Sequence, residues 1–203
     1  MDHAPYEFDD SDEETDNLTK TVDKHETGSK TPGASFKTIE ITQHCYETYL
    51  ALLCWIGTGR IAFAPLRSTF VNESTGEGEE SHTRAKLIED SLELADPRSP
   101  SLVSPKSIYR LADYLQISKL SQIALANFTS QLTHDNVLQE LYSDLAGKYP
   151  AIRDITLDYT VEHWKEIVKT RGYEEVSKKG DDGGLDGATG LLLSAKLMER
   201  WAK

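Results

Sequence analysis

Residues 104–164 contain successive short apolar patterns with the spacing of α-helices, and each pattern follows a residue type that commonly starts a helix. Ser104, Ser118 and Thr133 precede the first three segments, and Pro150 begins a fourth. Serine and threonine cap helices because their oxygens accept hydrogen bonds from free backbone N–H groups, and proline is tolerated in a first turn. The apolar positions that repeat at helical spacing are Ile108, Leu111, Ala112, Leu115; Leu120, Ile123, Ala124, Phe128, Leu132; and Val137, Leu138, Leu141. The pattern predicts a packed array of helices.

Polar residues are concentrated in two other parts of the chain. The sequence has 203 residues, a formal net charge of −12 and 38% hydrophobic residues. Globular domains usually contain about 45–50% on a count that includes glycine. Most of the polar excess falls in residues 1–35 and 68–104, so the remainder is apolar enough to bury a core.

We expect residues 1–35 to form a disordered acidic tail, because its carboxylates repel one another and few apolar residues oppose them. Ser11 precedes three acidic residues, a context that suits an acid-directed kinase; an unmodified, solvated tail is the alternative. We expect a second disordered segment at about 68–104, an insertion rich in Gly and Glu near 76–80.

The region between tail and insertion predicts three elements. Residues 36–42 alternate apolar and polar side chains, as a half-buried strand does. Residues 43–56 have helical periodicity and end at the glycines of 57–59, and residues 61–66 contain a short extended element. One face of the expected helix holds Tyr46, Tyr49, Leu50, Leu53 and Ile56, and Leu52 and Trp55 widen its apolar surface.

The C-terminal part predicts one long helix, a loop and a last helix. The long helix extends from residue 150 to about 170, with Ile152, Ile155, Tyr159, Trp164 and Ile167 on its core side. Residues 171–187, rich in Gly and Asp, predict a loop. Residues 188–202 predict the last helix, with Leu191, Leu192, Ala195, Met198 and Trp201 roughly on one face.

Motifs that would indicate chemistry are not found. Cys45 and Cys54 lie nine residues apart on one expected helix, about 13 Å by the helical rise, which is too far for a disulfide. No histidine pairs with Cys or His at the i+3 or i+4 spacing of a zinc site. No serine lies in a Gly-x-Ser-x-Gly turn, and no glycine-rich segment fits a phosphate-binding loop. We therefore expect no catalytic, metal or cofactor residues.

The acidic composition also limits the partners. Nucleic-acid binding requires clustered Lys and Arg, and an acidic chain is repelled by anionic membranes. No run approaches about 20 apolar residues, and no signal-peptide pattern opens the chain. We expect other proteins as partners, in the cytoplasm or nucleus.

Several of these segments, in their order, resemble the BTB/POZ domain. Residues 53–59 (LCWIGTG) are similar to the signature that ends a central BTB helix, and residues 61–66 follow as a short strand does there. Residues 108–115 (IYRLADYL) resemble the LAD helix of that fold, and residues 120–132 resemble its closing helix. Together with the acidic YEFDDSD at residues 6–12, the combination is most similar to the BTB proteins abundant in basidiomycete fungi.

The resemblance covers roughly residues 36–66 and 104–170 and implies an α+β, mainly α-helical fold. Residues 36–132 would form a truncated BTB/POZ-like core with an insertion at about 68–104. Residues 133–203 would form a BACK-like helical extension. The strand, dimerisation helix and sheet that begin a complete BTB domain have no counterpart before Phe36. The chain is therefore expected to be a fragment, or to bury the uncovered face against a partner.

The implied function is non-enzymatic protein–protein interaction. The alternatives are a substrate adaptor of a cullin-type ubiquitin ligase and a transcription-associated scaffold, with self-association or a cullin as candidate partners. Tyr46, Tyr49 and Leu53 are the candidate partner-binding residues. A core position for the two tyrosines is the equally weighted alternative.

Overall fold

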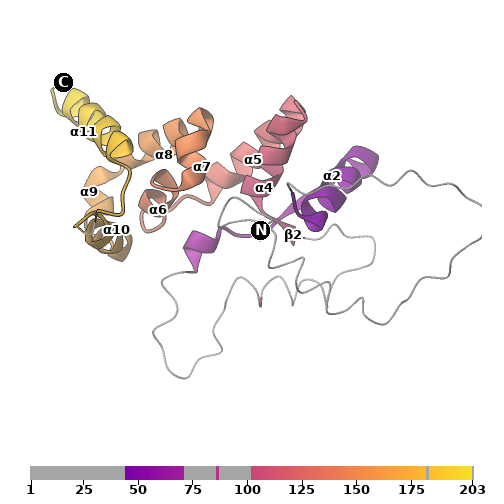
Figure 1. Ribbon diagram of the computed structural model, residues 1–203, viewed down its shortest axis with the longest axis horizontal. Coiled ribbons are helices and arrows are strands. Elements are labelled where there is room, and N and C mark those ends of the chain that lie inside the picture. The colour runs from indigo at the N-terminus through magenta and orange to yellow at the C-terminus, as the bar shows by residue number, and fades with distance from the viewer. Residues whose placement is uncertain (1–43, 71–85, 87–101, 182, 203) are drawn as a thin grey trace, which may run out of the picture. The chain divides into compact units, whose positions relative to one another are not determined.

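The computed structural model describes residues 44–70, 86, 102–181 and 183–202 (Figure 1). These residues are mainly helical, which confirms the mainly α-helical expectation. The expected tail with Ser11, the strand at 36–42 and most of the expected insertion lie outside the described residues.

The described residues belong to two compact units. The first unit contains residues 44–64, 86 and 102–121, and the second contains 65–70, 122–181 and 183–202. The division falls between Ala64 and Pro65 and again within a helix at Ser121.

The first unit places helix α2 (Tyr46–Thr58) against helix α4 (Pro105–Tyr114), beside a short parallel strand pair. Strand β1 (Ala62–Phe63) pairs with β2 (Leu102–Val103), and the Ala64 amide donates to the Val103 carbonyl at 2.9 Å. Strand β2 lies near the C-terminal end of the insertion expected at about 68–104.

Helix α4 is the centre of the first unit, because every residue from Pro105 to Ala112 is buried. Ser104 caps the start of this helix, as predicted. Its hydroxyl oxygen accepts hydrogen bonds from the Lys106 and Ser107 amides at 3.2 and 3.4 Å. After the helix, Gln116 adopts a left-handed φ of 58° before α5 (Ser118–Ser130) begins.

The second unit is a helical array around one apolar cluster. Helices α6 (Val137–Leu141) and α8 (Pro150–Glu162) pack together, and α10 (Arg171–Asp181) and α11 (Gly187–Trp201) cover them. The shorter elements are the 3-10 helix η2 (Arg67–Thr69), α7 (Asp144–Lys148) and α9 (Trp164–Ile167). The buried cluster consists of Val137, Leu138, Leu141, Leu157, Ile167, Val176, Leu193 and Leu197.

A polar network joins η2 to the start of α6. The Leu66 amide donates to Gln131 Oε1 at 2.6 Å, and the Ser68 hydroxyl donates to Glu140 Oε1 at 2.6 Å. Thr133 and Asn136 satisfy each other's backbone amides reciprocally, at 2.8 and 3.2 Å, as in a capping box. Helix α6 itself begins at Val137 after Asn136, so it starts four residues later than Thr133, where the sequence predicted its start.

Three predicted elements differ from the observed ones. Residues 171–181 form helix α10, so the loop expected at 171–187 was wrong over most of its length. The helix expected over 150–170 breaks at His163, where α8 ends and α9 begins. Helix α2 includes Gly57 and ends only at Gly59, whose φ of 70° forms the left-handed cap.

The expected core side of the long helix was also partly wrong. Ile152 and Ile167 are buried, but Thr156, Leu157 and Thr160 share that face, while Tyr159 is half-buried. The two threonine hydroxyls are satisfied by donating to carbonyls one turn back, at 2.7 to 3.0 Å, so their burial leaves no orphan donor.

Candidate interaction surface

Helix α2 has one buried face and one apolar exposed face. The buried residues are Glu47, Thr48, Ala51 and Leu52. On the opposite side Tyr46, Leu50, Leu53 and Ile56 are 65%, 40%, 61% and 61% exposed. These four side chains, called the α2 surface below, follow one another at helical spacing and form a continuous stripe.

The polar residues of α2 are placed against expectation. Glu47, its only charged residue, is 2% exposed, whereas the large apolar residues face outward. Helix α2 packs on α4 through this buried face, and Lys106 and Arg110 of α4 are also buried. The outward α2 surface is therefore both apolar and uncharged.

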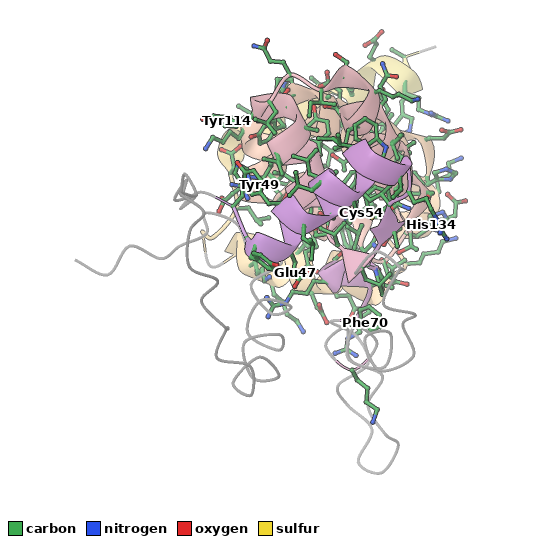
Figure 2. The ribbon with its side chains drawn as sticks, turned by 90° about the vertical axis from the view of Figure 1, so that its right-hand side faces the viewer. Glu47, Tyr49, Cys54, Phe70, Tyr114 and His134 are labelled. Atoms are coloured by element: carbon green, nitrogen blue, oxygen red, sulfur yellow. The ribbon has the colours of Figure 1, made fainter. Side chains whose placement is uncertain are left out.

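Tyr49 lies at the edge of this surface in a small ring cluster. His44 packs edge-on against Tyr49 with centroids 6.0 Å apart, and its centroid also lies 6.0 Å from that of Tyr114. Figure 2 shows Tyr49 and Tyr114 on the same side of this unit. Tyr114 is 64% exposed, so the cluster extends the α2 surface toward the end of α4.

The environment of this cluster shifts two pKa values. Partial burial lowers the pKa of His44 below 6.5, and the nearby positive charge of Arg110 lowers it further. Partial burial raises the pKa of Tyr49, with a further contribution from Tyr114. Both shifts favour uncharged side chains at the edge of an already uncharged surface.

The three predicted binding residues therefore occupy different positions. Tyr46 and Leu53 lie on the exposed stripe, while Tyr49 is half-buried and its ring packs against that of His44. Sequence reasoning missed His44 and Tyr114, because a contact between α2 and the end of α4 leaves no mark in the local spacing.

A second ring cluster in the other unit was also missed. The ring of His163 lies close to two others. Its centroid is 5.0 Å from that of His134 and 4.6 Å from that of Tyr159. The two histidines are distant in sequence, so no local spacing could reveal them. Over the residues that the structure describes, no group of three or more His, Cys, Asp or Glu could hold a metal ion.

The two cysteines lie at different depths and form no disulfide, as their spacing predicts. Cys45 is buried just before α2. Cys54 is half-buried and lies 3.7 Å from the Thr58 hydroxyl, one turn further along the helix.

Comparisons with known proteins identify no relative: no protein-family model matches the chain, and neither a curated protein nor a solved structure matches it. In the part of the chain that the structure describes, every helix is too short or too polar to cross a membrane.

Proposed function

We propose that this chain is a non-enzymatic protein–protein interaction module of BTB type, which binds its partner through the α2 surface. The order of elements supports the BTB resemblance. A helix ends at Gly59, a short strand follows, and after the intervening segment come β2 and the helix pair α4 and α5. In this proposal, the helices from α6 to α11 are the BACK-like extension.

The observation that carries the proposal is the inverted burial of α2. A surface helix normally turns its apolar stripe inward. Here Tyr46, Leu53 and Ile56 each expose more than half of their surface, while Glu47 is buried. An apolar stripe without charges suits a partner that also presents an apolar stripe, because no ion has to be desolvated on binding.

The α2 surface still has apolar area to bury against a partner. Full burial of a large apolar side chain is worth about 1.5–3 kcal/mol. The side chains of the α2 surface are 40% to 65% exposed. Burial against a partner would therefore yield roughly half of that free energy for each of them. Tyrosine is also among the residues enriched at the energetic centres of protein interfaces.

The proposal can be tested with the tagged full chain as bait in extracts of its source cells. Leu53→Glu places a charge in the middle of the α2 surface, and Tyr46→Ala removes its exposed ring. We expect both variants to bind the partner at least about tenfold more weakly, which corresponds to a loss of about 1.4 kcal/mol of binding free energy. Ala126→Glu is the matched control, because Ala126 is an exposed residue in the middle of α5.

Circular dichroism and thermal unfolding separate binding from folding in these variants. Leu53→Glu and Tyr46→Ala should keep the helical signal and unfold near the wild-type temperature, since both residues are exposed. Tyr49→Ala should lose partner binding and also some stability, because Tyr49 is half-buried. A partner set that is identical for wild type, Leu53→Glu and Ala126→Glu would contradict the proposal.

The adaptor alternative makes a narrower prediction. A substrate adaptor must bind a cullin directly, so titration of the purified chain with a purified cullin N-terminal domain should give saturable binding that Leu53→Glu removes. Partner capture without cullin binding would favour a simple interaction module or a transcription-associated scaffold.

A further inference from the structure

A second exposed apolar stripe lies on helix α11 of the other compact unit. Leu191, Met198 and Trp201 are 74%, 68% and 64% exposed, and Leu192 is 43% exposed. Ala195 and Ala202 are exposed on the same side. We call Leu191, Ala195, Met198 and Ala202 the α11 seam. Leu192 and Trp201 lie on its flanks.

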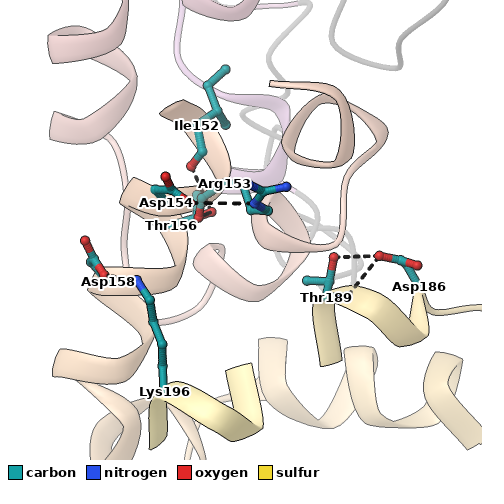
Figure 3. A network of polar contacts seen from close by, with 8 residues as sticks. All are labelled: Ile152, Arg153, Asp154, Thr156, Asp158, Asp186, Thr189 and Lys196. Atoms are coloured by element: carbon teal, nitrogen blue, oxygen red, sulfur yellow. Dashed lines mark hydrogen bonds and ion pairs between the residues drawn. The ribbon is translucent and has the colours of Figure 1, made fainter. Parts of the chain in front are cut away.

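The orientation of α11 is determined by contacts on its other sides. Thr189, Leu193 and Leu197 are buried, and the two leucines belong to the apolar cluster of this unit. Lys196 Nζ binds Asp158 Oδ1 of α8 at 2.5 Å (Figure 3). These contacts hold the α11 seam on the side of the helix that faces away from the core.

The spacing of the seam is that of a helix-pairing surface. Its members follow one another at intervals of four, three and four residues, which is the apolar repeat of paired helices. Large and small side chains alternate along it. When two copies of α11 lie antiparallel about a two-fold axis, Ala195 faces Met198 of the other copy and Leu191 faces Ala202. Every large seam residue then meets a small one.

We propose that a second copy of this chain occupies the α11 seam, with the two α11 helices antiparallel. The self-complementary order of large and small residues is what a two-fold interface requires, since the same patch must fit itself. On the flanks, the same register places Trp201 over Leu192 of the other copy. The two flanking leucine–tryptophan contacts close both ends of the seam.

The charges of the helix are compatible with this pairing. In the antiparallel register Glu199 faces Ser194 of the other copy, so no like charges confront each other across the seam. Helix α11 carries Lys196, Arg200 and Glu199, whereas the whole chain has a net charge of −12. Two such chains repel each other at long range, and α11 offers them a contact on a helix with two basic side chains and one acidic side chain.

The exposed area indicates a weak dimer. A standard interface buries about 800 Å² on each partner. A large aromatic side chain supplies about 150–250 Å² when fully buried, so four partly exposed large side chains supply on the order of half the standard area. We therefore expect a dimer that dissociates on dilution.

Sedimentation equilibrium of the full chain tests the proposal. Between about 1 μM and about 1 mM, the average mass should rise from the 22.7 kDa monomer toward twice that value. Raising the salt concentration from about 50 to about 500 mM should strengthen association several-fold, because salt screens the repulsion between acidic chains and no ion pair crosses the seam. An average mass that stays at the monomer value throughout would overturn the proposal.

A pair of complementary variants tests the register. Ala195→Glu and Met198→Lys should each weaken self-association at least about tenfold, and both should fold, because both residues are exposed. An equimolar mixture should associate again, because residue 195 of one chain then faces residue 198 of the other with opposite charge, while the second contact keeps its native residues. Ala126→Glu should associate as the wild type does.

Each other result counts against the proposal. Unchanged association of Ala195→Glu would place the interface elsewhere, and failure of the mixture to associate would exclude the antiparallel register. The dimer is also independent of partner binding through the α2 surface. Leu53→Glu should leave self-association unchanged, so a failure of either proposal can be recognised separately.

Discussion

The hydroxyl of Ser68 donates a hydrogen bond of 2.6 Å to the carboxylate of Glu140, across 72 positions of sequence. Both side chains are buried. The bond joins η2 to α6. The hydrogen bond from the Leu66 amide to Gln131 holds the same segment two residues earlier. Both contacts lie within the second unit and hold the segment 66–68 against its helices.

Removing this hydrogen bond should destabilise the second unit. Hydrogen bonds to charged groups contribute about 1.5–3 kcal/mol, so Ser68→Ala should lower the free energy of unfolding by about 2 kcal/mol. Urea unfolding followed by circular dichroism measures the difference. Ser130→Ala is the control, because the Ser130 hydroxyl donates to a nearby carbonyl at an exposed site and its loss should cost below about 0.5 kcal/mol. Equal losses in the two variants would contradict the assignment.

Gly172 should tolerate no side chain. A β-carbon at this position would lie 1.8 Å from the carbonyl oxygen of Asp135, where the first turn of α10 approaches the segment before α6. Gly172→Ala should therefore destabilise the protein by about 3 kcal/mol or more, since backbone must move. Thermal unfolding provides the measurement.

Gly147 in α7 is the matched position for that experiment. A β-carbon there meets nothing within 4 Å, and the backbone is helical. Gly147→Ala should stabilise the protein by about 0.4–1 kcal/mol, because alanine restricts the unfolded chain. Similar changes in stability for Gly172→Ala and Gly147→Ala would contradict the close approach of α10 to the Asp135 carbonyl.

The Asp186 cap should make α11 sensitive to acid. Hydrogen bonds from the Thr189 hydroxyl and the Thr189 and Ala188 amides lower the pKa of Asp186. The folded state therefore holds this proton less tightly, so the stabilisation is present above the ordinary pKa near 3.8 and is lost as pH falls through the lowered value. Asp186→Ala should be less stable than wild type at neutral pH, and the difference in thermal midpoint should shrink toward pH 2. A difference that is constant with pH would contradict this role.

His44 should give the first unit a pH dependence of its own. Its pKa is lowered by burial and by Arg110, so below pH 6.5 the unfolded chain binds more protons at this position than the folded chain does. Stability should therefore rise with pH between the lowered pKa of the folded state and the ordinary value of 6.5, and should level off above it. His44→Gln should flatten this part of the unfolding free-energy profile, whereas an unchanged slope would exclude His44 as its source.

The amount that could be predicted from sequence differs between elements. The helix start at Ser104 was predictable, because a capping side chain and the amides that donate to it lie within three residues. Helix α10 was not, because glycines and charges favour a loop locally. Packing of Val176 in the apolar cluster holds it in place, and the exposed Arg171–Glu175 pair at 2.9 Å adds little.

The candidate surfaces show the same distinction. Helical periodicity in the sequence already placed Tyr46 and Leu53 on one stripe of α2, and Leu191 and Met198 on one stripe of α11. Periodicity describes which side chains share a face, since that follows from 3.6 residues per turn.

Only the tertiary structure decided which of those faces is covered. Glu47 and Thr48 are buried in α2 on the side that α4 packs against, and Leu193 and Leu197 are buried in α11, which packs against α8. Burial depends on contacts between segments far apart in the chain, and local spacing contains no information about those contacts. The sequence by itself thus determined most of the helices and which of their residues share a stripe, and the packing of distant segments left the outer stripes of α2 and α11 open to solvent.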